Sequence, residues 1–305
     1  MLNVAIMGCG KIANRIAIGI KHSKGNLYAC ASRDIDKAKE FAEKYDIEKW
    51  CDYEGLLNDD EVDLVYIATI NPTHEELIRR CILHGKHVIC EKPMVESRRK
   101  VEELFDLAKE NKVFLMDAHK TCFIPLNQYL KSNIDKIGKI IRIDAERADL
   151  VDRGSLIPCN RNDTMGGCFY DIGSYPAIFS LFFADSDIKD LSVSCIKEEE
   201  YDVETVVDIE YENGIRSNIK TSWLYDGENK AIIVGDKGTI EIEDYWKGKK
   251  AIVNGELIEV SHESDFTGEV DHALECIEKG LLESPVMSRK MNIRLVGIGE
   301  EVKRQ

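Results

Sequence analysis

The sequence has no apolar run approaching the roughly 18 residues that a membrane-spanning helix needs. Its first 20 residues are apolar, but Lys11 and Arg15 interrupt them, so they lack the continuous apolar core and cleavage site of a signal peptide. Positive charge is also scarce, with 41 basic against 56 acidic residues and a formal net charge of −15. Such a chain is repelled by phosphate backbones and anionic lipids. We therefore expect neither a nucleic-acid partner nor a membrane partner.

The cysteines show none of the patterns that mark a metal site. Ten are present, but no two form a CxxC pair and none stands at zinc-site spacing from a histidine. Cys30 and Cys90 lie inside apolar runs, as buried thiols do. Disulfides are rare in the reducing cytosol. We therefore expect reduced thiols, no bound metal and a cytoplasmic protein.

The length of 305 residues suggests two domains at about 150 residues each. Up to about residue 120, short apolar runs alternate with helical patterns. Strands are expected at 3–7, 27–31, 64–68, 87–90 and 113–116, and helices at 12–20, 34–45, 73–84 and 97–111. This alternation predicts an α/β fold with a doubly wound parallel sheet, a Rossmann domain over residues 1–119.

The second domain, residues 120–305, has a different rhythm. Strands are expected in succession at 139–147, 191–197, 205–211, 215–223, 230–234, 238–243 and 250–260, and helices at 172–183, 270–279 and 288–303. Tight turns between consecutive strands predict an α+β domain with a large, mostly antiparallel open sheet. Because helices are too few to cover both faces of this sheet, we expect a homodimer or a higher homo-oligomer.

A glycine loop joins the first expected strand to the first expected helix. Residues 8–13 read GCGKIA, the G-x-G-x-x-A pattern of dinucleotide binding in its proper context. Gly8 permits the turn, Gly10 lets the backbone approach a pyrophosphate, and Ala13 packs the helix on the sheet. Lys11 and Ile12 fill the variable positions beside the phosphates. A plain strand-to-helix turn is the alternative, but the βαβ units behind the loop favour the cofactor.

The end of the second strand indicates which dinucleotide is bound. NAD sites carry an acidic residue there, which binds the ribose 2′-hydroxyl. Here the strand runs into Ser32 and Arg33, a hydroxyl and a guanidinium that suit a 2′-phosphate. Asp34 is more simply the N-cap of the next helix. The pattern favours NADP over NAD, although a later strand end would bring Asp34 to the ribose.

Three longer motifs carry a family resemblance. Residues 68–74 read ATINPTH, residues 91–93 read EKP after a strand, and residues 166–176 read GGCFYDIGSYP. With the glycine loop, these segments resemble the Gfo/Idh/MocA oxidoreductase family, and the Tyr-Pro ending is similar to its branch of trans-dihydrodiol and xylose dehydrogenases. The resemblance spans essentially the whole chain. It implies an NAD(P)-dependent oxidoreductase that transfers a hydride between nicotinamide and a sugar, polyol or cyclic diol.

The resemblance also implies which side chains do the chemistry. Lys92, Asp171 and Tyr175 would be catalytic: Tyr175 would exchange the substrate's proton, Lys92 would orient the hydroxyl, and Asp171 would hold a second hydroxyl or position Lys92. The cofactor would further contact Thr69, Asn71, His74 and Glu91, and Lys92 as well. Without the resemblance, Lys92 is a loop lysine, Asp171 a helix N-cap and Tyr175 a core aromatic.

Two segments depart from the branch. The linker carries Cys122 where branch members often have an arginine, and residues 159–167 lack the tryptophan that many have there. In relatives both positions line or support the substrate side, so the sequence leaves the substrate open. Two other functions remain: an NAD-dependent glycosidase of the same fold, and a nucleotide-binding sensor without catalysis.

Overall fold

The computed structural model describes residues 1–162 and 164–305, which pack into two compact units. The first holds Met1–Val95, Arg99–Lys120 and Glu263–Arg289, and the second holds Glu96–Arg98, Thr121–His262 and Lys290–Gln305. This differs from the continuous division into 1–119 and 120–305, because residues 263–289 return to the first unit. Their helix α9 (Thr267–Glu278) packs on α1 (Ala13–Lys21), where Thr267 Oγ1 donates a hydrogen bond to the Gly19 carbonyl at 3.1 Å.

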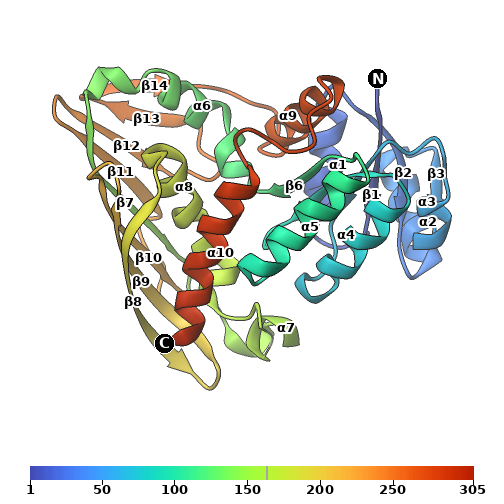
Figure 1. Ribbon diagram of the computed structural model, residues 1–305, viewed down its shortest axis with the longest axis horizontal. Helices are drawn as coiled ribbons and strands as arrows, with labels where there is room; N and C mark the ends of the chain where they lie inside the picture. The colour runs from blue at the N-terminus through green and yellow to red at the C-terminus, as the bar shows by residue number, and fades with distance from the viewer. Residues whose placement is uncertain (163) are drawn as a thin grey trace. The chain divides into compact units, whose positions relative to one another are not determined.

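The first unit is built on a six-stranded sheet, and every neighbouring pair of strands is parallel (Figure 1). Its order is β3-β2-β1-β4-β5-β6, with β1 at Asn3–Met7, β2 at Asn26–Ala31, β3 at Lys49–Cys51, β4 at Leu64–Ile67, β5 at His87–Glu91 and β6 at Leu115–Ala118. Besides α1 and α9, the helices are α2 (Ile35–Tyr45), α3 (Tyr53–Leu57), α4 (His74–Leu83) and α5 (Arg98–Glu110). The predicted doubly wound α/β fold is confirmed.

Two short elements of this unit escaped the sequence analysis. Strand β3 has three residues and helix α3 has five, which is too short for apolar periodicity to show. Helix α3 is held at its start by Asp52, whose side chain accepts the Gly55 N–H at 2.7 Å. This segment pairs with β2 and completes the edge of the sheet.

The second unit contains an eight-stranded sheet in the order β14-β13-β12-β11-β7-β10-β9-β8, antiparallel except for the β7–β10 pair. The strands are β7 (Ile140–Ala148), β8 (Ile188–Glu198), β9 (Tyr201–Tyr211), β10 (Arg216–Ser222), β11 (Lys230–Gly235), β12 (Thr239–Glu243), β13 (Lys250–Val253) and β14 (Glu256–Glu259). The expected mostly antiparallel sheet is confirmed. The strand expected at 250–260 is instead a hairpin, because Asn254 and Gly255 form a tight turn within it.

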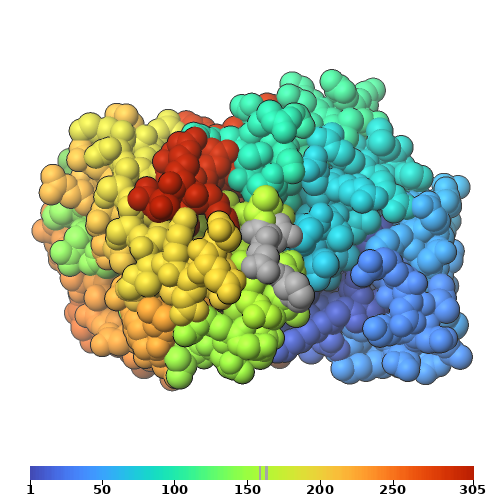
Figure 2. All heavy atoms as spheres, turned by 90° about the horizontal axis from the view of Figure 1, so that it is seen from below, coloured from blue at the N-terminus to red at the C-terminus, as the bar shows by residue number. Residues whose placement is uncertain are grey.

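Four α-helices accompany this sheet in the described residues: α6 (Pro125–Ser132), α7 (Pro158–Asn162), α8 (Ser174–Ala184) and α10 (Arg289–Arg304). Helix α8 packs on β7 and β10. The C-terminal helix lies beside β8 and β9 in both views (Figures 1 and 2). Its Arg294 binds Asp187, just before β8, with an Nε–Oδ1 distance of 2.9 Å. Helices α6 and α7 were not expected.

Helix α8 begins differently from expectation, with a turn of π-helix at Phe169–Gly173 before the α-helix starts at Ser174. Buried Asp202 on β9 anchors this turn. Its Oδ2 accepts the Phe169 N–H at 2.9 Å and the Cys168 thiol at 2.9 Å. Gly167 has φ +103°, and a Cβ there would lie 1.9 Å from Asp202 Oδ1. Only glycine therefore lets the chain come close enough to this carboxylate to start the turn.

Candidate functional site

The glycine loop is shaped by its contact with the end of β4. Gly8 has φ +107°, and a Cβ there would lie 2.8 Å from the Ala68 carbonyl oxygen. Its N–H donates to the Ala31 carbonyl at 2.8 Å, which ties the loop to β2 as well. A side chain at this position would collide with Ala68 and Thr69 at the end of β4. Gly8 therefore fixes where the chain turns from β1 into α1.

The rest of the loop is open toward a ligand. A Cβ at Gly10 would meet no heavy atom within 4 Å, and Lys11 is exposed. Ile12 stands at the N-cap of α1 and no side chain caps the first turn, so the backbone N–H groups there can serve an anion. Ala13 is fully buried under the helix. These residues fit the pyrophosphate of a dinucleotide.

Past β2, the polar side chains are arranged as a helix start. Asp34 caps α2, where its Oδ1 accepts the Lys37 N–H at 3.4 Å. The Asp34 N–H in turn donates to Ser32 Oγ at 3.2 Å. Arg33, between them, is exposed. Asp34 is thus engaged as the N-cap that the sequence indicated, and the first side chains after β2 are a hydroxyl and a guanidinium.

The loop after β4 is tied to the loop after β5 by one buried histidine. Thr69 and Thr73 share a hydroxyl contact of 2.7 Å across the short turn that Asn71 begins. His74 is fully buried, with Nδ1 2.9 Å from the Pro93 carbonyl oxygen and Nε2 3.2 Å from that of Thr69. Burial lowers the pKa of His74, so the neutral ring donates only one of the two bonds.

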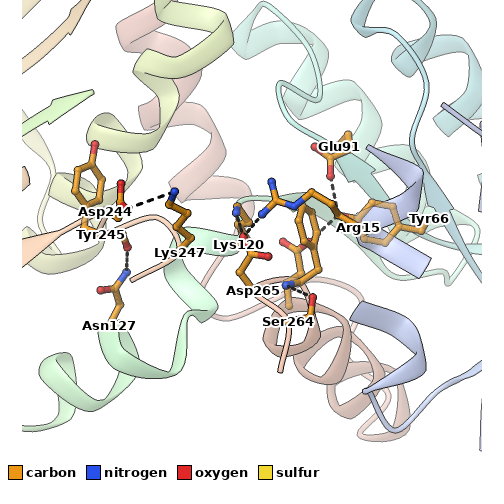
Figure 3. A network of polar contacts seen from close by, with 12 residues as sticks. Arg15, Tyr66, Glu91, Lys120, Asn127, Asp244, Tyr245, Lys247, Ser264 and Asp265 are labelled. Atoms are coloured by element: carbon orange, nitrogen blue, oxygen red, sulfur yellow. Dashed lines mark hydrogen bonds and ion pairs between the residues drawn. The ribbon is translucent and has the colours of Figure 1, made fainter. Parts of the chain in front are cut away.

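Glu91 is the last residue of β5 and Lys92 follows it. Lys92 is half-buried, whereas Glu91 is 8% exposed and accepts a hydrogen bond from the Tyr66 hydroxyl at 2.9 Å (Figure 3). Burial raises the pKa of Glu91, and the charge of Lys92 opposes that rise. The EKP segment therefore places a lysine at the carboxyl end of a parallel strand, where open α/β sheets bind their ligands.

In the second unit, Asp171 lies within the π-helical turn and Tyr175 in the first turn of α8, and both are half-buried. The Tyr175 ring centre lies 6.2 Å from that of Trp246. The Arg147 guanidinium stacks on Trp246 at 3.6 Å and lies 5.9 Å from the Tyr175 ring centre. Sequence reasoning missed Arg147 and Trp246, because β7 and the segment after β12 meet Tyr175 only in the folded unit.

A second missed group lies in the first unit. Lys120, 3% exposed, and Arg15 both pair with the Asp265 carboxylate, and the Arg15 contact is 2.5 Å (Figure 3). Both cations lie over the Phe266 ring, at 4.9 Å for Lys120 and 5.0 Å for Arg15. Burial lowers the pKa of Lys120. Nothing in the sequence marks residues 263–289 as a partner of α1.

The catalytic residues expected from the sequence are divided between the units. Lys92 belongs to the first, with all the expected cofactor residues, and Asp171 and Tyr175 belong to the second. Each group has a defined environment of its own. The segment at 159–167, where a branch tryptophan is absent, includes residue 163, which lies outside the described residues.

Comparison with known proteins supplies the family. A model described as an oxidoreductase family with an NAD-binding Rossmann fold matches residues 2–119, and one for the GFO/IDH/MocA C-terminal domain matches residues 128–241. A trans-1,2-dihydrobenzene-1,2-diol dehydrogenase from Mus musculus is 32% identical, covering 99% of this chain and 96% of its own. The chain belongs to the Gfo/Idh/MocA oxidoreductases. It is therefore an NAD(P)-binding oxidoreductase, as the motifs indicated.

Solved structures of this family share the fold. A 3-ketoreductase from Actinomadura kijaniata, solved with NADP and TDP-benzene, has a TM-score of 0.87 at 23% identity and covers 99% of this chain and 97% of its own. An aldose–aldose oxidoreductase from Caulobacter crescentus, solved with glycerol, has a TM-score of 0.87 at 21% identity and covers 99% and 96%. At such identities the likeness establishes the architecture.

Other features bear on partners and metals. Among the residues that the structure describes, no group of three or more His, Cys, Asp or Glu side chains is arranged to hold a metal ion. The ten cysteines form no disulfide in this part of the chain. None of the described helices is both long and apolar enough to span a bilayer.

Substitution of the two loop glycines should have different effects, one on cofactor binding and the other on stability. Gly10→Ala adds a methyl group into open space, so it should leave Tm near the wild-type value while weakening cofactor binding about tenfold or more, since that space faces the phosphates. Gly8→Ala strains the backbone against Ala68 and should destabilise the fold by about 1–3 kcal/mol. Calorimetry for Tm and cofactor fluorescence titration for Kd measure both. A Gly10→Ala protein with wild-type Kd would contradict the assigned cradle.

Proposed function

We propose that this enzyme transfers a hydride between NADP and a CH–OH carbon of a sugar, polyol or cyclic diol. One observation carries the proposal: parallel strands bring the loops of Gly10, Ser32, Thr69 and Lys92 to one edge of the first sheet. This edge is where doubly wound sheets bind dinucleotide and substrate. The name of the mouse relative, a diol dehydrogenase, supports the substrate class.

Bound NADP would supply the hydride acceptor or donor. The chain must then hold the substrate and move one proton. Tyr175 accepts the hydroxyl proton on oxidation and returns it on reduction, as a general base and acid. The cationic Lys92 orients the reacting hydroxyl and favours the phenolate by its charge. Asp171 binds a neighbouring hydroxyl or holds Lys92, which accounts for a substrate with more than one oxygen.

The Gly8–Ala13 loop would hold the pyrophosphate, with Lys11 beside it and the N–H groups after Ile12 aimed at it. In the loop after β4, Thr69 and Asn71 would line the nicotinamide ribose. His74 and Glu91 would support these two residues. These assignments rest on the loop positions described above and on the family motifs.

A substrate panel with a lysine variant tests the proposal. Aldoses, polyols and cyclic diols are supplied with NADP and with NAD, and NADPH or NADH absorbance is followed. Net cofactor reduction is expected with wild type. Lys92→Ala should keep Tm and cofactor Kd but lose about 10²-fold or more in kcat, because a positioned charge is removed.

The outcomes of the panel separate the alternatives. Product release from a glycoside without net redox change would indicate the glycosidase, and cofactor binding without turnover on any substrate would indicate the sensor. A Lys92→Ala enzyme with near wild-type kcat would remove Lys92 from the mechanism.

Preference for NADP follows from Ser32 and Arg33. A charge-assisted contact from Arg33 to the 2′-phosphate contributes roughly 1.5–3 kcal/mol, or about ten- to a hundredfold in kcat/KM over NAD. The capping role of Asp34 supports this preference, because its carboxylate is already hydrogen-bonded to the backbone of α2. Ser32→Asp with Arg33→Ala should move the preference toward NAD. A wild type that prefers NAD, or a double variant with an unchanged ratio of kcat/KM for the two cofactors, would show that the 2′-phosphate site is not at Ser32 and Arg33.

We also propose a cytoplasmic homodimer that pairs through the large sheet. Burial alternates along β9: every second residue from Val203 to Ile209 is buried, whereas Glu204 and Val206 are partly exposed and Asp208 is exposed. On the partly exposed face, the cross-strand pair Ile252 and Leu257 is 39% and 56% exposed. Light scattering at micromolar concentration should give twice the mass of 34.6 kDa. A monomer would contradict the proposal.

A further inference from the structure

Three buried oxygen-bearing side chains meet behind Lys92. Tyr66 on β4 has its hydroxyl oxygen 2.9 Å from Glu91 Oε1 (Figure 3). The same oxygen lies 2.6 Å from Glu269 Oε1. Tyr66 and Glu269 are fully buried and Glu91 is 8% exposed. Glu269 belongs to α9, the helix that returns to the first unit. None of these contacts is used by the proposed chemistry, yet one member directly precedes its lysine.

The number of hydrogens in this cluster fixes its charge. A phenolic hydroxyl has a single hydrogen to donate, whereas an ionised carboxylate can only accept. If both glutamates were ionised, one of the two short contacts would join two oxygens with no hydrogen between them. One of the two carboxyl groups must therefore carry a proton and donate it to the tyrosine oxygen.

The surroundings place that proton on Glu269. It is wholly buried, and its Oε2 has no hydrogen-bond partner among the described residues. Burial raises its pKa well above the ordinary value, and the charge of Glu91 adds to the rise. For Glu91, burial acts in the same direction, but the charge of Lys92 acts against it. The Tyr66 hydroxyl lowers the pKa of both glutamates, so it does not distinguish them.

The other charged groups around the cluster do not change which of the two glutamates carries the proton. Lys120 lies near both glutamates and lowers the pKa of each. Asp265 raises that of Glu269, and Asp117 on β6 raises that of Glu91. Only Glu91 has a lysine as its chain neighbour. The hydrogen bonds therefore run from Glu269 to Tyr66 and from Tyr66 to Glu91, which remains a carboxylate.

We propose that Tyr66 and Glu269 are positioning residues that keep Glu91 ionised, so that its negative charge holds the Lys92 ammonium group at the reacting hydroxyl. This inference rests on the proposed role of Lys92. It explains why α9 inserts an acidic residue against the apolar sheet, where a carboxyl group costs stability unless it has a partner.

Removing the Tyr66 hydroxyl should shift the pKa of Glu91 in a defined direction. Glu91 would lose the hydrogen bond that favours its charged form, so its pKa would rise and it would take up a proton at higher pH. The Lys92 ammonium group would then lose a nearby negative charge that holds it in place. In the reduction direction Tyr175 must be protonated, so its titration limits activity at high pH, and the acid limb of the profile reports Glu91.

The experiment compares pH profiles of kcat and kcat/KM for reduction with NADPH, using wild type, Tyr66→Phe, Glu269→Gln and Tyr211→Phe. Tyr66→Phe should move the acid limb to higher pH by about one unit, with cofactor Kd unchanged. Glu269→Gln keeps a donor toward Tyr66 and should retain the wild-type limb. Tyr211→Phe removes another buried hydroxyl, bonded to Ser180 at 2.6 Å, and controls for lost stability.

An infrared measurement tests the proton without turnover. The wild-type spectrum at neutral pH should contain a carboxylic-acid carbonyl band that Glu269→Gln removes. An acid limb of Tyr66→Phe that coincides with wild type, or a Glu269→Gln limb displaced as far as that of Tyr66→Phe, would overturn the inference, as would the absence of the infrared band. If no substrate is turned over, the proposed function fails by itself, and the infrared result still decides where the proton lies.

Discussion

Parallel pairing of β1 with β2 and β4, and of β4 with β5, is the constraint on which the candidate site depends. Parallel strands present their carboxyl ends at the same edge, so every loop that leaves them opens on one side of the sheet. The close approach of Gly8 to Ala68 then sets the spacing between two of those loops, and His74 joins a third to them through the carbonyl of Pro93. The cofactor cradle is thus a property of the sheet edge rather than of the glycine motif alone.

The second unit positions its polar residues by another device. Asp202 draws the start of the π-helical turn against β9 through backbone and thiol hydrogen bonds. A π turn adds a residue to the helical repeat and is found often at functional sites. Here it directs where Asp171 stands relative to Tyr175, four residues later. The neighbouring stack of Arg147 on Trp246 places a positive charge beside that tyrosine.

Buried charge is concentrated where residues 263–289 return to the first unit. Asp265 pairs with both Lys120 and Arg15, and Glu269 enters the cluster with Tyr66 and Glu91. Burial of an ionisable group costs folding free energy unless the group is paired or neutral. The packing of this segment on the first unit therefore depends on how the charges there are paired. In this arrangement residues 263–289 supply the acidic side chain that meets Tyr66 and Glu91 behind Lys92.

The sequence by itself determined the two sheets, the glycine loop, the helix cap at Asp34 and the strand-end position of Lys92, because each is a local pattern of periodicity, turn chemistry or capping. It left out β3 and α3, which are too short for a period, and the π turn, which depends on Asp202 some 30 residues away. Only the tertiary structure decided that Glu269 is hydrogen-bonded to Tyr66 and that Arg147 lies over the Tyr175 ring. Such contacts join residues far apart in the chain, and burial, which sets their charge, exists only once the chain has folded.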